Sequence, residues 1–328
     1  METNLSRRGF LTGAAAAGAL AAMGLAGCAP TPAAEGSTKT AETGTAATSW
    51  RDKPEMPTEF VETVDADIVV VGAGNGGLVA ATTAAQNGAK VVVLEKAGAI
   101  AAAREAIGAL NSKLAPDHQE DVPTLLNHAN QTQSGDANML MYKTWAEKSG
   151  EMIEWMADTL GPKGMLFPFE WHCPDDPHAY YPAMCYNPCI GEYNPDGPNY
   201  NSYAHLEVMR DVFTDDLGGE IRFECPAQQL VIDESGRVTG VVAEGKEGFI
   251  QVNAAKGVII CTGGYGANNE MLADLAPGNS AWCALRDSVT ETGDGIRMAL
   301  WAGAEFEAGG ACMIWNRAIL PDGFEFNE

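Results

Sequence analysis

A glycine-rich turn between an apolar strand and a helix places the strongest constraint on the fold of this chain. Residues 67–71 read Asp-Ile-Val-Val-Val, a run typical of a strand buried on both faces of a parallel sheet. The next six residues are Gly-Ala-Gly-Asn-Gly-Gly, and residues 78–81 open a predicted helix. A second apolar run over residues 90–94 ends at Glu95. This order predicts a strand, a helix and a second strand of an α/β fold with a parallel sheet.

Each part of this unit has a physical role in holding a dinucleotide. Gly72 permits a tight turn, Gly74 allows a pyrophosphate to approach the backbone, and Gly77 allows the helix to pack closely on the strand. The helix N-terminus offers free N–H groups to the phosphates, and Glu95 can accept hydrogen bonds from a ribose. The unit therefore predicts a Rossmann-type domain, the alternative being a glycine-rich turn without a ligand. Its predicted cofactor-binding residues are Gly72, Ala73, Gly74, Gly76, Gly77, Glu95 and Lys96.

Two later segments distinguish FAD from NAD. An apolar run over residues 256–261 leads into a Thr-Gly-Gly turn, and Glu-Thr-Gly-Asp-Gly at residues 291–295 opens a helix. Together with the first turn they resemble the flavoprotein subunits of fumarate reductases and succinate dehydrogenases, over residues 65–110 and 205–305. The resemblance implies that FAD is the cofactor and that Asp294 contacts its flavin side. It also implies a cofactor-binding turn at Thr262, Gly263 and Gly264.

The same resemblance extends the predicted FAD-binding surface. Residues 220–223 and two β-runs joined by Asp-Glu-Ser-Gly predict a strand followed by a hairpin. In the family this small sheet crosses over the adenine, and a residue at the position of Ala227 contacts the adenine through its backbone. Gly108 and Ala109 stand at the second of two glycine pairs that family members place around the flavin phosphates, whereas the first pair is absent here.

The segment over about residues 165–203 is predicted to be a loop insertion in this domain. Its density of Pro, Tyr and Asn favours an ordered loop over helices or strands. Such a loop is a candidate for substrate contact, the alternative being a surface loop with packed aromatic side chains. Its candidate donors to a substrate carboxylate or carbonyl are His172, His178, Tyr180 and Tyr181.

Three cysteines lie in this segment, Cys173, Cys185 and Cys189, and a Cys185–Cys189 or a Cys173–Cys185 disulfide stays open as an alternative. An iron–sulfur cluster normally needs four thiolates at closer spacing. No metal site is therefore predicted.

The first residues predict an export signal rather than a part of the fold. Arg7 and Arg8 precede an apolar run rich in Ala and Gly that is short for a membrane span. Leu-Ala-Gly-Cys at residues 25–28 resembles a bacterial lipobox. We expect a twin-arginine lipoprotein signal over residues 1–28 with lipidation of Cys28, plain cleavage nearby being the alternative. The protein would then lie in the cell envelope, lipid-anchored on the outer face of the cytoplasmic membrane or periplasmic.

The composition after the signal predicts a flexible tether over residues 29–60, followed by the FAD-binding domain over residues 61–328. In the whole chain, 44 acidic residues stand against 20 basic ones, a net charge of −24. This charge excludes nucleic acid as a partner and repels anionic membrane surfaces. Membrane contact is therefore predicted only through the lipid anchor.

The length of the chain departs from the family. Fumarate-reductase-like flavoproteins continue past the Gly-Asp-Gly helix into a cap domain and a C-terminal FAD-binding segment, which hold most of the catalytic residues. This chain ends at Glu328, a short way after that helix. We therefore expect an N-terminal fragment in which the cap domain and the C-terminal FAD segment are missing, and no catalytic residue is predicted.

The resemblance implies an exported FAD-dependent oxidoreductase that reduces an activated C=C bond, as in fumarate or another unsaturated carboxylate. Its electrons would come from a cytochrome or a quinol-linked membrane protein, as in anaerobic respiration. Two alternatives stay open. One is a ketosteroid-dehydrogenase-like or aspartate-oxidase-like flavoenzyme, and the other is a FAD-binding fragment without catalysis.

Overall fold

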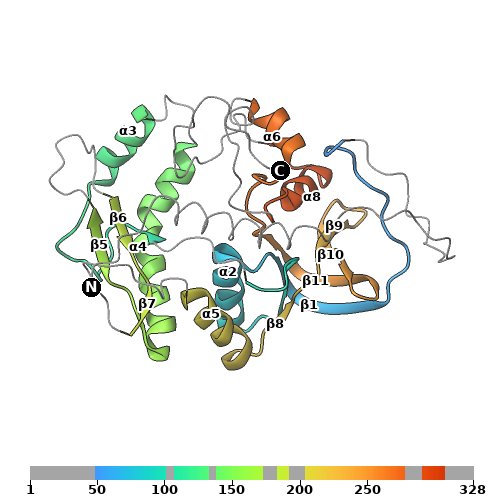
Figure 1. Ribbon diagram of the computed structural model, residues 1–328, viewed down its shortest axis with the longest axis horizontal. Helices are drawn as coiled ribbons and strands as arrows, with labels where there is room; N and C mark the ends of the chain where they lie inside the picture. The colour runs from blue at the N-terminus through green and yellow to red at the C-terminus, as the bar shows by residue number, and fades with distance from the viewer. Residues whose placement is uncertain are drawn as a thin grey trace, which may run out of the picture. The chain divides into compact units, whose positions relative to one another are not determined.

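A six-stranded sheet with the order β8-β2-β1-β11-β10-β9 is the centre of the computed structural model (Figure 1). Strands β8, β2, β1 and β11 are parallel, whereas β10 and β9 are antiparallel to their neighbours. The predicted α/β fold, a parallel sheet with a β-crossover, is confirmed. The strands are β1 Glu62–Val71, β2 Val91–Leu94, β8 Glu220–Arg222, β9 Ala227–Ile232, β10 Val238–Gly245 and β11 Gly248–Ile260. The structure describes residues 49–100, 107–132, 138–172, 183–191, 204–277 and 290–306.

Two long strands, β1 and β11, join the parallel part of the sheet to the crossover. The first half of β11 pairs with β10, and the second half of β1 pairs with β2. The register between β1 and β11 shifts between Ala66 and Ile68, at the boundary between the first and second halves of β1. The predicted strands began too late, at residues 67 and 256, because only the second halves form unbroken apolar runs.

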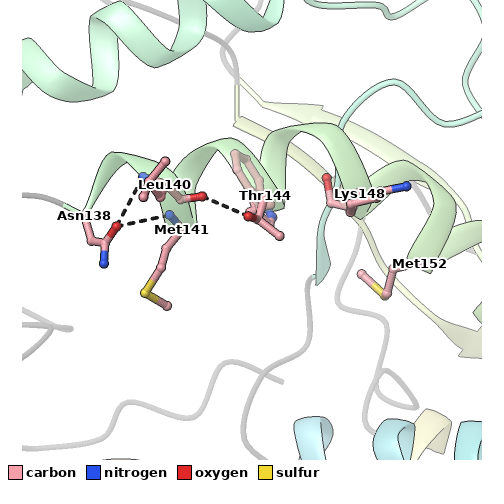
Figure 2. A pocket seen from close by; sticks show the side chains of 8 residues that line it. Asn138, Leu140, Met141, Thr144, Lys148 and Met152 are labelled. Atoms are coloured by element: carbon pink, nitrogen blue, oxygen red, sulfur yellow. Dashed lines mark hydrogen bonds between the residues drawn. The ribbon is translucent and has the colours of Figure 1, made fainter. Parts of the chain in front are cut away.

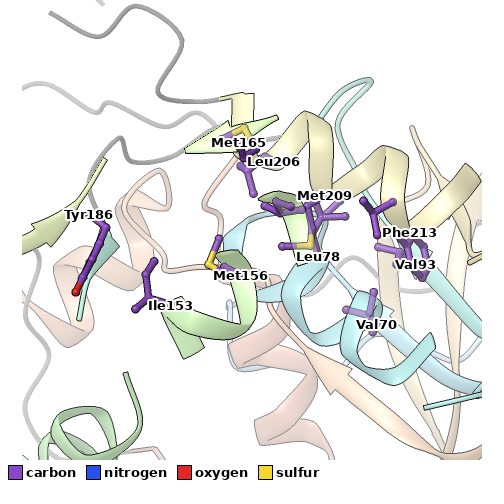
Figure 3. Packing of buried hydrophobic residues seen from close by; sticks show 14 of the residues in the cluster. Val70, Leu78, Val93, Ile153, Met156, Met165, Tyr186, Leu206, Met209 and Phe213 are labelled. Atoms are coloured by element: carbon purple, nitrogen blue, oxygen red, sulfur yellow. The ribbon is translucent and has the colours of Figure 1, made fainter. Parts of the chain in front are cut away.

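Helices cover both faces of the sheet because successive residues of a strand point to opposite sides. Val70 packs with Leu78 of α2 in one buried cluster (Figure 3). Val69 and Val71 belong to a second cluster with Met298 of α8. The helices around the sheet are α2 Asn75–Gln86, α5 Ala204–Asp211, the π-helical turn η2 Val212–Asp216, α6 Asn269–Leu275 and α8 Asp294–Trp301.

Helices α3 and α4 with short strands β3 to β7 form what we call the α4 region. The strands make one sheet with the order β3-β6-β5 and a pair, β4-β7. Ile153 of α4 and Tyr186 of β6 belong to the same buried cluster as Val70 (Figure 3). The elements are β3 Ile107–Gly108, α3 Val122–Thr132, α4 Met139–Leu160, the 3-10 turn η1 Gly161–Lys163, β4 Met165–Leu166, β5 Phe169–His172, β6 Ala183–Tyr186 and β7 Cys189–Ile190.

The prediction of a loop without strands over residues 165–203 is therefore wrong where the structure describes this segment. Strands β4 to β7 all lie within it, each two to four residues long. Met165, Tyr186 and Cys189 are buried, and backbone groups that are buried with them are paired across these strands. Strands this short are hidden from sequence patterns because they hold too few residues to show alternation.

The predicted tether over residues 29–60 extends too far. The Trp50 side chain is only 5% exposed, and its Nε1 donates a hydrogen bond to Asp274 of α6 at 3.0 Å. Gln229 of β9 donates to the backbone oxygen of Pro54 at 2.8 Å. Residues from 49 onward thus belong to the folded domain, because one aromatic side chain and paired backbone oxygens fix them on it.

The predicted signal and Cys28 lie outside the described residues. Within the described part of the chain, no helix combines the length and the apolar character that crossing a bilayer requires.

Candidate functional site

The turn between β1 and α2, residues 72–77, is shaped by contacts between backbone atoms; we call it the glycine turn. Gly72 has a φ of +100°, and a Cβ at this position would overlap the carbonyl group of Cys261. A Cβ at Gly77 would overlap the carbonyl oxygen of Gly72. A Cβ at Gly74, by contrast, would have no heavy atom within 4 Å. Protein packing thus requires glycine at two of these positions, and the space beside Gly74 is open to a ligand.

The N-terminus of α2 lies directly behind this open space. Its N-cap residue is Gly74, no side chain caps it, and its first turn holds no acidic residue. The first N–H groups of a helix have no partner within the helix and favour an anion. The glycine turn therefore offers the open space and the free donors that suit phosphate groups.

Glu95 lies beside the glycine turn at the end of β2. Its Oε2 accepts a hydrogen bond from the N–H of Ala73 at 2.8 Å, and its Oε1 accepts one from Ala97 at 2.8 Å. The side chain is only 6% exposed. Because each carboxylate oxygen has further acceptor capacity, this fixed group can also bind ribose hydroxyls.

A charged cluster connects Lys96, which follows Glu95, to the start of α8. The Nζ of Lys96 lies 2.7 Å from Oδ2 of Asp294 and 2.7 Å from the Thr292 hydroxyl. Arg297 at 2.5 Å and the Thr292 hydroxyl at 3.0 Å also donate hydrogen bonds to Asp294. Burial alone would raise the pKa of Asp294, but the hydrogen bonds from Lys96 and Arg297 hold this pKa below its usual value. Asp294 is therefore an ionised group in a fixed position.

Thr292 and Arg297 are members of this cluster that sequence reasoning missed. Arg297 lies three residues after Asp294 on α8 and forms an i,i+3 ion pair with it. An acidic and a basic residue three positions apart on a predicted helix indicate such an ion pair, so the sequence pattern could have identified Arg297.

The Thr-Gly-Gly turn after β11 packs against the same segment. Thr262 accepts a hydrogen bond through its hydroxyl from the N–H of Gly295 at 3.2 Å, and Gly264 accepts one through its carbonyl from Gly293 at 3.1 Å. Gly263 has a φ of +70°. The two motifs, about 30 residues apart in the sequence, therefore form one unit at the end of the parallel strands.

The remaining predicted residues lie in two other places. Ala227 begins β9, two residues after Cys225, whose N–H donates to the backbone oxygen of Glu95 at 2.9 Å. Gly108 and Ala109 lie in and just after β3 of the α4 region, and Ala109 shares a buried cluster with Ala73. The structure thus brings the glycine turn and the segment at the start of α8 into contact through Glu95, Lys96 and Asp294. Ala227 and Ala109 belong to segments that contact Glu95 and Ala73.

A hollow of about 530 Å³ lies along one face of α4 (Figure 2). Trp145, one of its lining residues, donates from its indole N–H to the backbone oxygen of Gly108 at 3.2 Å. Lys148 is the one charged residue among those that line the hollow. It is lined by Asn138, Leu140, Met141, Thr144, Trp145, Lys148, Ser149 and Met152.

Most of the candidate substrate contacts fall on residues that the structure does not describe: His178, Tyr180 and Tyr181 lie outside its ranges, and His172 is described only as the end of β5. Cys189 is buried with a free thiol, so no disulfide joins it to Cys185.

Comparison with known proteins identifies the family. The model of the FAD binding domain matches residues 67–316, which is most of the chain. The chain belongs to this FAD-binding family. FAD is therefore the cofactor, as predicted, and the family consists of FAD-dependent oxidoreductases of the fumarate reductase type.

Named relatives support the resemblance. A digoxin reductase of Eggerthella lenta is 29% identical over 93% of this chain and 56% of its own length. A probable fumarate reductase, Ifc3, of Shewanella frigidimarina is 26% identical over 72% of this chain and 38% of its own length. A 3-oxosteroid 1-dehydrogenase of Comamonas testosteroni is 48% identical over 46 residues. The chain spans about half the length, or less, of the curated relatives it matches.

Solved structures share the fold. A 3-ketosteroid-Δ4-(5α)-dehydrogenase from Rhodococcus jostii RHA1 has a TM-score of 0.62 and 23% identity, over 76% of this chain and 55% of that one. The open conformation of a flavocytochrome c3 fumarate reductase has a TM-score of 0.60 and 22% identity, over 85% of this chain and 47% of that one.

The residues present fit FAD. The open space at Gly74 and the uncapped N-terminus of α2 would hold the pyrophosphate, and the carboxylate of Glu95 would hold the ribose. Lys96 and Asp294 would lie toward the flavin.

Proposed function

We propose that this chain is the FAD-binding part of a reductase that acts on an activated C=C bond, with an unsaturated carboxylate as the substrate class. The observation that carries the proposal is the match to the FAD binding domain over residues 67–316, joined to relatives named as fumarate and digoxin reductases. Fumarate is itself an unsaturated dicarboxylate.

The residues of the site have distinct roles in this proposal. The glycine turn and Glu95 bind the nucleotide part of the cofactor and thereby fix its position. Asp294, held by Lys96 and Arg297, keeps one negative and two positive charges in a fixed arrangement near the flavin side. FAD, when bound, supplies the hydride.

A dye-linked assay tests the proposal. The flavin-loaded protein is mixed with a reduced viologen dye and a panel of unsaturated acids, and dye oxidation is followed. We expect oxidation that depends on one of these acids and is absent from the Gly74→Val variant. A flat trace at full flavin occupancy would contradict catalysis by this chain and favour a FAD-binding fragment.

Steroid oxidation is the second candidate, favoured by the segment that is 48% identical to a 3-oxosteroid 1-dehydrogenase. This reaction runs in the opposite direction, from a C–C to a C=C bond, and needs an electron acceptor. The two candidates are distinguished by mixing the same protein with a saturated 3-ketosteroid and an oxidised dye. Dye reduction in this assay, with no turnover of unsaturated acids, would replace the first proposal by the second.

We also propose that the protein is exported by the twin-arginine route and held by a lipid at Cys28, with a cytochrome or quinol-linked membrane protein as its electron donor. The sequence of residues 1–28 supports this proposal. Replacing both Arg7 and Arg8 by Lys should retain the protein in the cytoplasm. Cys28→Ala should instead release it from the membrane fraction, which cell fractionation would detect; membrane attachment that survives this substitution would overturn the lipid anchor.

A further inference from the structure

Asn75 is the one residue of the glycine turn with a polar side chain. It is the first residue of α2, next to Gly74. Asparagine side chains can accept hydrogen bonds from nearby backbone N–H groups, and the N-cap residue of α2, Gly74, has no side chain that would occupy the first N–H groups of the helix. Here the Oδ1 of Asn75 lies 2.8 Å from Nε2 of His205 instead, and α2 has no side-chain cap. The amide oxygen is thus held away from the phosphate-binding N–H groups.

His205 is suited to hold that oxygen in place. It is fully buried on α5, which packs against α2. Because an amide oxygen can only accept, Nε2 of His205 must be the protonated nitrogen and the donor. Breaking this hydrogen bond between part-buried groups costs free energy, because the donor and the acceptor are both largely removed from water. A buried histidine on one helix therefore fixes the side chain of a turn residue on another.

Fixing the amide oxygen also fixes the NH2 group of Asn75, which lies on the other branch of the planar amide. Among the described residues, none accepts a hydrogen bond from Nδ2 of Asn75. Donors in this position favour an anionic group, whereas a carbonyl oxygen there would repel it. We propose that His205 is a positioning residue that makes Asn75 present donors, and no acceptor, to the FAD phosphates.

The inference rests on FAD binding at the glycine turn. Without His205, the Asn75 side chain could rotate and its oxygen could accept a hydrogen bond from a nearby backbone N–H group of the turn. It would then compete with phosphate for that N–H group. Loss of His205 should therefore weaken FAD binding through Asn75, and a double-mutant cycle separates this route from any effect on the fold.

A double-mutant cycle tests this coupling on full-length apoprotein. FAD affinity is measured by quenching of flavin fluorescence, and the melting temperature of the apoprotein reports the fold. We expect Asn75→Ala and His205→Leu each to weaken FAD binding about tenfold, the effect of losing a hydrogen bond to a charged group. The double variant should bind no more weakly than Asn75→Ala alone. His205→Gln, which keeps an N–H donor, should restore most of the affinity.

Two outcomes would overturn the inference. One is an equal loss of affinity from His205→Leu in the presence and absence of Asn75. The other is a change in melting temperature alone, which would make His205 a purely structural residue.

If His205→Leu does not fold, Asn75→Asp decides, because it keeps an acceptor for His205 but replaces the NH2 group by an anionic oxygen. It should bind FAD about tenfold more weakly than Asn75→Ala, and equal affinities would overturn the inference. The Gly74→Val variant distinguishes a wrong role for His205 from a wrong position of the FAD site. If the Gly74→Val variant binds FAD with the same affinity as the unmodified protein, FAD does not bind at the glycine turn.

Discussion

The glycine turn and the α4 region pack against one buried cluster, yet they are built from different kinds of contact. In the glycine turn, backbone atoms meet backbone atoms, as where Gly77 abuts the carbonyl of Gly72. In the α4 region, side chains such as Ile153 and Tyr186 fill the interior. A backbone contact permits only glycine, whereas many combinations of apolar side chains fill the same volume. Several such contacts at a fixed spacing, as in the glycine turn, can therefore be recognised in the sequence, whereas side-chain packing cannot.

The largest effect is expected from Gly77→Ala in the glycine turn. The added Cβ would overlap the Gly72 carbonyl, and neither backbone can move without displacing β1 or α2. We expect a loss of about 3 kcal/mol in the free energy of unfolding, at the upper end of overpacking effects, together with loss of FAD. Urea denaturation of the apoprotein measures the first and flavin absorbance the second.

Gly76→Ala is the matched control, one residue away in the same helix. Its Cβ would lie 3.7 Å from Sγ of Cys261, an ordinary contact. Because alanine favours a helix, this variant should be as stable as the unmodified protein or more stable, by up to about 1 kcal/mol. If the two variants were equally destabilised, backbone contact would not be what distinguishes these glycines.

Gly74→Val should remove FAD without unfolding the protein. Gly74 has an extended backbone with φ −82°, which valine adopts readily, and its Cβ would enter open space. The valine side chain would then occupy the space of the pyrophosphate. We expect FAD affinity to fall at least about a hundredfold and the free energy of unfolding of the apoprotein to change by less than about 1 kcal/mol. A large loss of apoprotein stability would show that Gly74 serves packing rather than the ligand.

These differences explain which parts of the structure could be predicted. Gly72, Gly77 and Glu95 are each dictated by one contact at a fixed spacing, so the order of strand, turn and helix around them was predicted correctly, although both the strand and the helix begin earlier than predicted. The first half of β11 was missed because its residues alternate between polar and apolar and lack the unbroken run. Trp50 was assigned to a tether because its partner Asp274 lies 224 residues away, and no local pattern reports such a contact.

Gly150 shows that the α4 region also contains a backbone contact, which the sequence did not reveal. It lies inside α4, and a Cβ there would overlap the carbonyl oxygen of Leu110. Gly150→Ala should cost about 1–2 kcal/mol despite the better helix propensity of alanine, because the Leu110 segment can shift more easily than a central strand. Gly161→Ala, at the end of the same helix with nothing within 4 Å of its Cβ, is the control and should be neutral. A neutral result at Gly150 would mean that the Leu110 backbone does not require glycine at this position of α4.

The smallest effect is expected from charge, and it depends on pH. The folded-state pKa of Asp294 lies below its usual value, because the hydrogen bonds from Lys96 and Arg297 outweigh the opposing effect of burial. A depressed carboxyl pKa stabilises the fold above the unfolded value, about pH 4, and this contribution is lost as the pH falls through the folded value. Asp294→Asn should therefore cost about 1 kcal/mol at pH 7, since desolvation offsets part of the gain, and progressively less below pH 4.

The corresponding group in the α4 region is Glu154, whose pKa is lowered by hydrogen bonds from the backbone N–H and the side chain of Lys113. The Lys113 side chain is 89% exposed, so water screens this pair, whereas the Lys96 side chain is only 27% exposed. Unfolding in urea at pH 7 and at pH 3 should accordingly show a smaller pH-dependent difference for Glu154→Gln than for Asp294→Asn. Equal differences would mean that the charged cluster at the cofactor site is no more shielded from water than an ordinary surface pair, and its fixed charges would then have little influence on a bound flavin.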